Sequence, residues 1–127
     1  MRLPPFLHRL ARDDRGTTAA EYGLVLPVML TAILGAMWVG MLMLSAGSLD
    51  LAVQAAARCM SVDANACGTS SATEAYALTQ YNGPNLSPTF AASTSGCGHT
   101  VTATANFNLN LLPGIGSVPL SASACYP

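Results

Sequence analysis

Residues Tyr22–Leu44 read YGLVLPVMLTAILGAMWVGMLML, and this stretch decides the fold. No charged residue occurs from Tyr22 to Leu49. A helix needs about 20 predominantly apolar residues to cross the roughly 30 Å hydrocarbon core of a bilayer. We therefore predict one membrane span over residues 22–46, with the lipid bilayer as one partner of the chain.

The overall composition favours a membrane or exported protein. Of the 127 residues, 9% are charged and 51% are hydrophobic, whereas charged residues make up about 25% of a soluble globular protein. The formal net charge is −1 and lysine is absent, so the chain has no basic surface with which to neutralise phosphates. We therefore expect no nucleic-acid partner, and the high hydropathy also argues against intrinsic disorder.

Charges on either side of the span predict its direction. The arginines that precede it are Arg2, Arg9, Arg12 and Arg15. The first cation after it is Arg58. Because cytoplasmic flanks are enriched in Arg, the N-terminus is predicted to be cytoplasmic. We divide the chain into a cytoplasmic basic leader at 1–16, a long helix at 17–60 and an extracytoplasmic domain at 61–127.

A cleaved secretory signal is an alternative to a permanent span. Ser45-Ala46-Gly47 imitates a small-residue cleavage site, and cleavage there would release a soluble product. The apolar run is longer than the 7 to 15 or so residues of a typical signal core, however. The helical pattern also continues past Gly47, which favours the span.

Beyond the span the pattern becomes amphipathic. One side carries Leu49, Ala52, Val53, Ala56 and Met60, and another carries Asp50, Gln54 and Arg58. This spacing predicts a single helix from Thr17 to Met60. A Gly- and Ser-containing connection at 61–70 is expected to end it.

The remainder predicts a small α+β ectodomain. Ser71 and Glu74 form a capping-box pattern that opens a short helix through about Gln80. After a polar loop to about Gly96, a period of two predicts a strand, with apolar positions at Val101, Ala103, Ala105, Phe107 and Leu109. A turn at 113–116 leads to a second alternating run, with apolar positions at Val118, Leu120, Ala122 and Ala124. The fold class is therefore α+β, with a long N-terminal helix, a short helix and a terminal β-hairpin.

All four cysteines fall on the predicted outer side, where disulfides form. Their spacing matches neither a CxxC redox motif nor paired zinc ligands. Three connectivities are possible, and we favour Cys59–Cys67 and Cys97–Cys125, because a hairpin would bring the second pair together.

Cys97-Gly98-His99 is the place where a thiol and an imidazole come close in sequence. The nearby chain has no carboxylate to orient them, so we expect a structural cysteine and a solvated His99. We predict no enzymatic activity, no cofactor and no metal site.

The junction before the span is Arg15-Gly16-Thr17-Thr18-Ala19-Ala20-Glu21-Tyr22. It resembles the processing site of class IV prepilins, in which a basic leader ends in Gly and the mature chain has Glu as its fifth residue. More narrowly, GTTAAEYGLVLPVML resembles the opening of TadE-like proteins of the tight adherence (Tad) pilus system, and Glu21-Tyr22 fits that branch.

The resemblance implies a minor pilin or pseudopilin in assembly of a Tad/Flp-type pilus, which serves adherence or secretion. A prepilin peptidase would cut between Gly16 and Thr17, in a protein of the bacterial cytoplasmic (inner) membrane. Other pilins or pseudopilins and the inner-membrane pilus platform would be its partners. Whether it enters a surface pilus is left open.

Further residues acquire expected roles from this resemblance. The freed Thr17 ammonium and the Glu21 carboxylate could neutralise each other. The alternative is that Glu21 is an ordinary carboxylate near the start of a helix, where it interacts favourably with the helix dipole. Pro27 cannot donate to the carbonyl of Gly23, which allows a local kink. The small residues Ala32, Ala36 and Gly40 recur at four-residue steps and allow close helix packing.

The competing function is a bitopic membrane anchor that presents a disulfide-bonded binding module at the cell surface. Such an anchor would keep its leader. The chain would then begin at Met1 and not at Thr17, whereas the released product would begin near Ser48.

Overall fold

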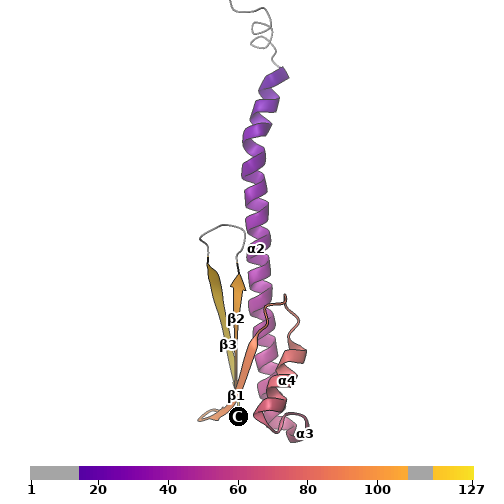
Figure 1. Ribbon diagram of the computed structural model, residues 1–127, viewed down its shortest axis with the longest axis vertical. Coiled ribbons are helices and arrows are strands. Elements are labelled where there is room, and N and C mark those ends of the chain that lie inside the picture. Colours follow the sequence, from indigo (N-terminus) through magenta and orange to yellow (C-terminus); the bar gives the residue numbers. More distant parts are fainter. Residues whose placement is uncertain (1–14, 109–115) are drawn as a thin grey trace, which may run out of the picture. The chain divides into compact units, whose positions relative to one another are not determined.

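The computed structural model describes residues 15–108 and 116–127, with side chains from residue 20 onward (Figure 1). The greater part of the basic leader, the end of the first predicted strand at Leu109 and most of the turn predicted at 113–116 lie outside the described residues. The chain separates into two compact units that meet between Trp38 and Val39, and each is described by itself.

The first unit is dominated by helix α2, which runs from Arg15 to Val62 and continues into the second unit. It contains the predicted long helix and extends beyond it at both ends. Leu, Met and Ala are good helix formers, and the helix continues through Pro27. In Figure 1 it is the long indigo-to-magenta ribbon.

A short helix that the sequence analysis missed follows α2. Helix α3 spans Ala64–Cys67, where only an irregular connection was expected. Asp63 caps it, because its Oδ1 accepts hydrogen bonds from the backbone N–H groups of Asn65 and Ala66 at 3.0 and 3.1 Å. An Asp followed by a four-residue helix leaves too short a periodic pattern to be recognised in the sequence.

Helix α4 spans Ser70–Gln80, but the predicted capping box was wrong. The N-cap is Thr69, whose Oγ1 accepts from the N–H of Ala72 at 3.2 Å. Glu74 does not reach back to the start of its helix. Its Oε1 accepts from the backbone N–H of Ala92 at 3.2 Å, on a neighbouring strand. Glu74 therefore bonds to strand β1 and not to the start of its own helix.

Three antiparallel strands form the sheet, in the order β1-β2-β3. Strand β1 (Thr89–Ser95) was predicted as loop, since it contains one large apolar residue, Phe90, among small residues. Strand β2 (Gly98–Asn108) and strand β3 (Ser117–Tyr126) form the predicted hairpin. Their register pairs Val101 with Ala124.

The core of the second unit lies between one sheet face and the helices. Alternation on β2 places Val101, Ala103, Ala105 and Phe107 inside and the intervening Thr and Asn residues outside, as the period of two predicted. The core cluster consists of Leu49, Ala52, Val53, Ala56, Ala57, Ala77, Phe90, Val101, Ala103 and Ala105. Many of its members are alanines, which bury little apolar area per residue.

Two glycines lie close to neighbouring atoms. A Cβ on Gly83 would overlap the Ser48 hydroxyl of α2, so the loop after α4 packs directly on that helix. Gly98 has φ +122° in the turn between β1 and β2, and a Cβ there would overlap the carbonyl oxygen of Tyr126. A side chain is excluded at Gly98, where the neighbouring atoms are backbone and φ is positive, whereas at Gly83 it would displace the side chains of Ser48 and Tyr81.

Candidate functional site

The predicted processing junction falls at the start of α2. Gly16 and Thr17 lie in its first turn, and Glu21 follows Thr17 by four residues. Residues four apart share one face of a helix, so the backbone places Thr17 and Glu21 on the same side. The Glu21 and Tyr22 side chains are exposed, Tyr22 by 74%. Both are therefore accessible to lipid, a peptidase or another subunit.

The apolar part of α2 is largely exposed in the described structure. Large side chains of this segment are exposed, Leu24 by 76% and Ile33 by 61% for example. By length and composition this is the one helix of the described residues that could cross a membrane, and none of its most apolar window is buried. A core helix of a soluble protein would be buried, so this exposure agrees with a single-pass membrane protein.

The residues expected to shape helix packing are also exposed. Ala32, Ala36 and Gly40 are all accessible, and a Cβ on Gly40 would meet nothing within 4 Å. Gly23, whose carbonyl would face the ring of Pro27, likewise has open space around it. The small-residue face is thus available for another helix to approach.

The second half of α2 is two-sided, as its pattern predicted. Leu49, Ala52, Val53 and Ala56 are at most 1% exposed, whereas Met60 is half-buried. Ser45 and Ser48 are buried as well, which the apolar pattern did not indicate. Their hydroxyls donate to the carbonyls of Met41 and Ser45, at 2.7 and 2.9 Å. A serine that bonds its own helix can be buried without a partner elsewhere.

The exposed side of the second half of α2 carries both polar and apolar residues. We define the outer stripe as Asp50, Leu51, Gln54, Arg58 and Val62, all of which are exposed. Arg58 lies between two open grooves. The first, of about 520 Å³, is lined by Leu51, Gln54, Ala55, Ala57, Arg58, Ala124, Cys125 and Tyr126. The second, of about 420 Å³, is lined by Ala55, Arg58, Cys59, Val62, Asp63, Ala66 and Tyr76.

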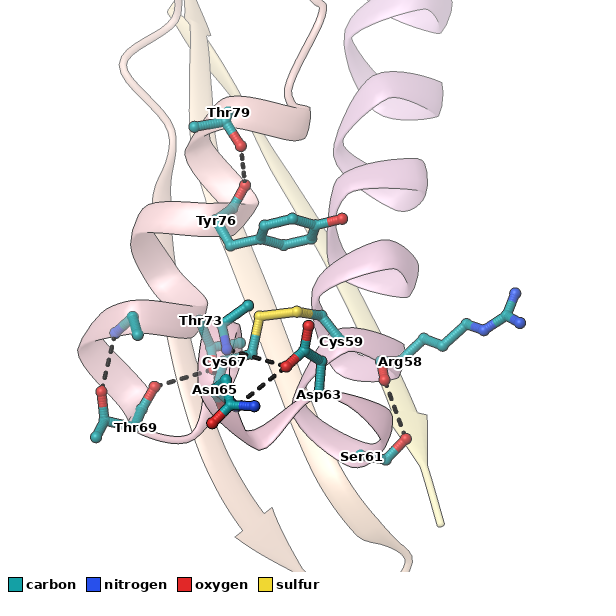
Figure 2. Close-up of a disulfide and its surroundings, with 12 residues drawn as sticks. Arg58, Cys59, Ser61, Asp63, Asn65, Cys67, Thr69, Thr73, Tyr76 and Thr79 are labelled. Atoms are coloured by element: carbon teal, nitrogen blue, oxygen red, sulfur yellow. Dashed lines mark hydrogen bonds between the residues drawn. A yellow bond between two sulfur atoms is a disulfide. The ribbon is translucent and has the colours of Figure 1, made fainter.

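One disulfide joins the end of α2 to α3, in the pairing that the sequence favoured. Cys59 and Cys67 have Cα atoms 5.7 Å apart, and Cys67 is fully buried. Figure 2 shows Tyr76 of α4 beside the sulfurs, and Arg58 pointing away from them. The buried Thr73 hydroxyl lies 3.0 Å from both the Cys67 and the Thr69 carbonyl oxygens, so α4 is fixed against this bridge.

The second disulfide, Cys97–Cys125, also has the favoured pairing, with Cα atoms 6.4 Å apart. It ties the turn after β1 to the end of β3, and both cysteines are exposed. Hydroxyls surround it: Thr100 Oγ1 lies 3.3 Å from the sulfur of Cys125, and Ser95 Oγ lies 3.2 Å from that of Cys97. The two bridges thus differ in surroundings, one packed under α4 and one at the surface.

Both cysteine pairs are oxidised and the chain has no free thiol. Cys97 therefore does not supply a nucleophile to His99 in this state. The expectation of a solvated His99 was wrong in part, because its Nδ1 is buried without a hydrogen-bond partner among the described residues. The imidazole lies on the inner side of β2, where it follows the strand alternation. No group of three or more metal-ligating side chains occurs within residues 15–108 and 116–127.

Comparison with protein families matches residues 16–58 to the model of TadE-like proteins. Comparisons with curated proteins and with solved structures find no significant match. The matched segment lies entirely within α2, from the glycine of the predicted junction to the arginine of the outer stripe. The predicted resemblance is confirmed: the chain carries a TadE-like segment, and this family indicates a role related to the Tad pilus.

Proposed function

We propose that the chain is a minor pilin or pseudopilin of a Tad/Flp-type pilus, cut after Gly16 by a prepilin peptidase. Its N-terminus would face the cytoplasm and its disulfide-bonded domain the outside of the bacterial inner membrane. The observation that carries the proposal is the exposed Glu21, one helical turn after Thr17, at the head of an exposed apolar helix in the TadE-like segment.

The chemistry of the junction follows from this geometry. Gly16 has no side chain to obstruct a peptidase that must reach the backbone of the next peptide bond. Hydrolysis between Gly16 and Thr17 adds water across the amide and leaves a carboxylate on the leader and an ammonium on Thr17. That ammonium would lie on the same helix face as Glu21. In a low-dielectric surrounding the two charges would stabilise each other, within one subunit or between neighbours.

The exposed small-residue face and Pro27 support assembly in a second way. Ala32, Ala36 and Gly40 allow a neighbouring helix to approach closely. Pro27 removes a backbone donor opposite Gly23, so the helix is locally less constrained where a subunit would be drawn from lipid into a fibre. Partners would be other pilins or pseudopilins and the inner-membrane platform.

The test of processing is the intact mass of the chain from native membranes. The parent should begin at Thr17, and Gly16→Leu should retain the leader because a branched side chain obstructs the peptidase. Gly35→Leu is the matched control: Gly35 has open space around it and lies far from the junction in sequence, so this variant should be processed normally. Equal processing of Gly16→Leu and the parent would contradict the proposal.

Glu21→Ala separates a pilin-like subunit from a simple membrane anchor. Removing a carboxylate from the edge of a span leaves an anchor inserted as well or better. In a pilin-like subunit the Thr17 ammonium would lose its partner, which costs about 3 to 5 kcal/mol for a buried pair. We expect normal insertion and processing but poor co-purification with other pilins and few surface pili. Normal piliation would favour the anchor.

A further inference from the structure

The Cys97–Cys125 bridge lies on the outer face of the sheet, next to hydroxyls from two strands. The register places Thr100 of β2 directly opposite Cys125 of β3. On its other side Thr100 pairs with Ser93 of β1, and Ser95 follows Ser93 by two residues, so it shares that face. Cys97 lies in the turn between β1 and β2. The strand pairing therefore brings two hydroxyls close to the two sulfurs.

The two hydroxyls form a short chain of hydrogen bonds that ends on the bridge. The Thr100 hydroxyl donates to Sγ of Cys125 at 3.3 Å. The hydroxyl oxygens of Ser95 and Thr100 are 2.7 Å apart. Because a hydroxyl has one proton and Thr100 directs its own to Cys125, Ser95 is the donor between the two. The order from Ser95 through Thr100 to Cys125 polarises both bonds in the same direction.

The two sulfurs therefore differ as leaving groups. A thiolate carries a full charge and accepts a hydrogen bond more strongly than a neutral sulfur does. Cleavage that leaves the charge on Cys125 strengthens the bond from Thr100. Cys97 has a longer contact with Thr100, at 3.5 Å, and the Ser95 hydroxyl 3.2 Å away is directed toward Thr100. A stabilised thiolate leaves faster in thiol–disulfide exchange, so Cys125 is the favoured leaving group.

Cys97 is accessible to an attacking thiol. Its side chain is exposed, and the neighbouring Gly96 has no atom within 4 Å of the position that a Cβ would occupy. The other bridge is different, because Cys67 is fully buried and Tyr76 lies beside the sulfurs (Figure 2). The open side of the Cys97–Cys125 bridge is thus the side opposite to its favoured leaving group.

The bridge can open without separating the strands that it joins. The pairing of β2 with β3 runs from His99 and Tyr126 to Asn108 and Ser117, and it includes the buried Val101. This pairing continues to hold Cys125 next to the turn when the sulfur–sulfur bond is broken. The two thiols therefore remain close enough to form the bridge again.

We propose that Cys97–Cys125 is a thiol-exchange site, at which the cysteine thiolate of another molecule attacks Sγ of Cys97 and Thr100 stabilises the departing Cys125. The attacking sulfur forms a bond to Cys97 as the Cys97–Cys125 bond breaks, and the electron pair of that bond remains on Cys125 as a thiolate. One disulfide is exchanged for another, without net oxidation. Attack of Cys125 on Cys97 expels the incoming thiolate and restores the bridge. The inference goes beyond the proposed function and does not depend on cleavage after Gly16.

The test treats the oxidised, full-length protein in detergent with reduced glutathione and stops the reaction early with N-ethylmaleimide. Peptide mapping should find glutathione on Cys97 and the maleimide on Cys125, about threefold or more in excess of the opposite arrangement. Cys59 and Cys67 should carry neither label at these times. Equal labelling of Cys97 and Cys125, or glutathione mainly on Cys125, would overturn the inference.

Variants of Thr100 test its role as a positioning residue. Thr100→Val keeps the shape of the side chain without the hydroxyl, so it should slow adduct formation about threefold and reduce the preference for Cys97. Thr100→Ser keeps the hydroxyl and should restore both. Thr102→Val is the matched control: Thr102 lies on the same strand and face, but its hydroxyl donates to the carbonyl of Ala91 at 3.3 Å. Its rate and preference should equal those of the parent.

The ratio of labels on the two sulfurs separates this role from a general loosening of the sheet, which would expose both sulfurs alike. An unchanged rate and ratio in Thr100→Val, or an equal change in Thr102→Val, would contradict the role of Thr100. Near-ultraviolet circular dichroism verifies that each variant folds. If Thr100→Val does not fold, Ser95→Ala removes the other hydroxyl of the chain and should lower the same ratio. The intact mass of these samples reports processing after Gly16 separately, so loss of exchange would leave the proposed function standing.

Discussion

The two halves of α2 have the same secondary structure but different surroundings. From Tyr22 to Leu44 the helix is rich in large apolar residues, and its side chains are exposed or half-exposed. From Ser45 onward one side is buried against the sheet and α4, and the other side carries charges. The exposed apolar surface of the first half of α2 favours contact with lipid. The small buried residues of the second half favour packing against other parts of the protein.

This difference teaches that hydropathy alone does not locate a protein core. The most apolar residues of the chain lie outside its core, while alanines and serines form much of the packed face of α2. Lipid accepts any apolar surface, but a protein partner must fit a shape. Five predictions test the comparison, beginning with the largest expected effect.

Two arginines in the first half should prevent stable insertion. Leu30→Arg with Ile33→Arg places two charges in the middle of the span, at a cost of about 5 to 7 kcal/mol on an insertion scale. Leu51→Arg with Val62→Arg places the same charges on the exposed side of the second half and should not affect insertion. Carbonate extraction of membranes measures the retained fraction. Equal retention of both double variants would contradict the division of α2.

Truncating a buried residue should destabilise the second half. Leu49 is 1% exposed and Leu51 is 68% exposed, so Leu49→Ala should cost about 2 to 5 kcal/mol of unfolding free energy. Leu51→Ala should cost less than about 0.5 kcal/mol. Urea unfolding of the full chain in detergent, followed by near-ultraviolet circular dichroism, compares the two. Similar midpoints would mean that this helix face is not a core.

Removing the disulfides should have unequal effects. Each bridge is expected to contribute about 2 to 4 kcal/mol, and the longer loop more. The loops span sequence separations of 8 for Cys59–Cys67 and 28 for Cys97–Cys125. We compare two double variants, each with both cysteines of one bridge replaced by Ala. The loop-entropy relation predicts that loss of Cys97–Cys125 lowers the unfolding free energy by about 1 kcal/mol more than loss of Cys59–Cys67.

The bridges should also differ in reactivity. A dithiol reductant should open the exposed Cys97–Cys125 bridge before the one that includes the buried Cys67. Alkylation and peptide mapping over time establish the order. The reverse order would show that packing at α4 does not protect the first bridge.

The smallest effect concerns the cap of α4, which packs against the second half of α2. Thr69→Ala should cost about 1 kcal/mol, because the N–H of Ala72 loses its acceptor. Ser71→Ala, at the position that the sequence suggested as cap, should cost less than about 0.5 kcal/mol. The same urea unfolding experiment distinguishes them. A larger loss at Ser71 would restore the capping box.

Much of the fold and of the candidate site could be predicted where the signal is periodic or long. The apolar run predicts one candidate span, and the 3.6 and 2.0 periods give the faces of α2 and of β2. The pairing of Cys97 with Cys125 followed from the hairpin that brings their ends together. The junction residues Gly16 and Glu21 came from a resemblance, which the family match over residues 16–58 confirms at family level.

What the sequence by itself determined is thus the long helix with its apolar and amphipathic halves, the β2-β3 hairpin and the resemblance of residues 16–58 to TadE-like proteins. Only the tertiary structure decided the rest. Strand β1 is formed by pairing with β2 and not by a pattern of its own. Thr69 caps α4, while Glu74 bonds to β1. A local sequence pattern indicates which secondary structure a segment can form. The partner of a hydrogen-bonding group depends on which residues the folded chain brings close to it.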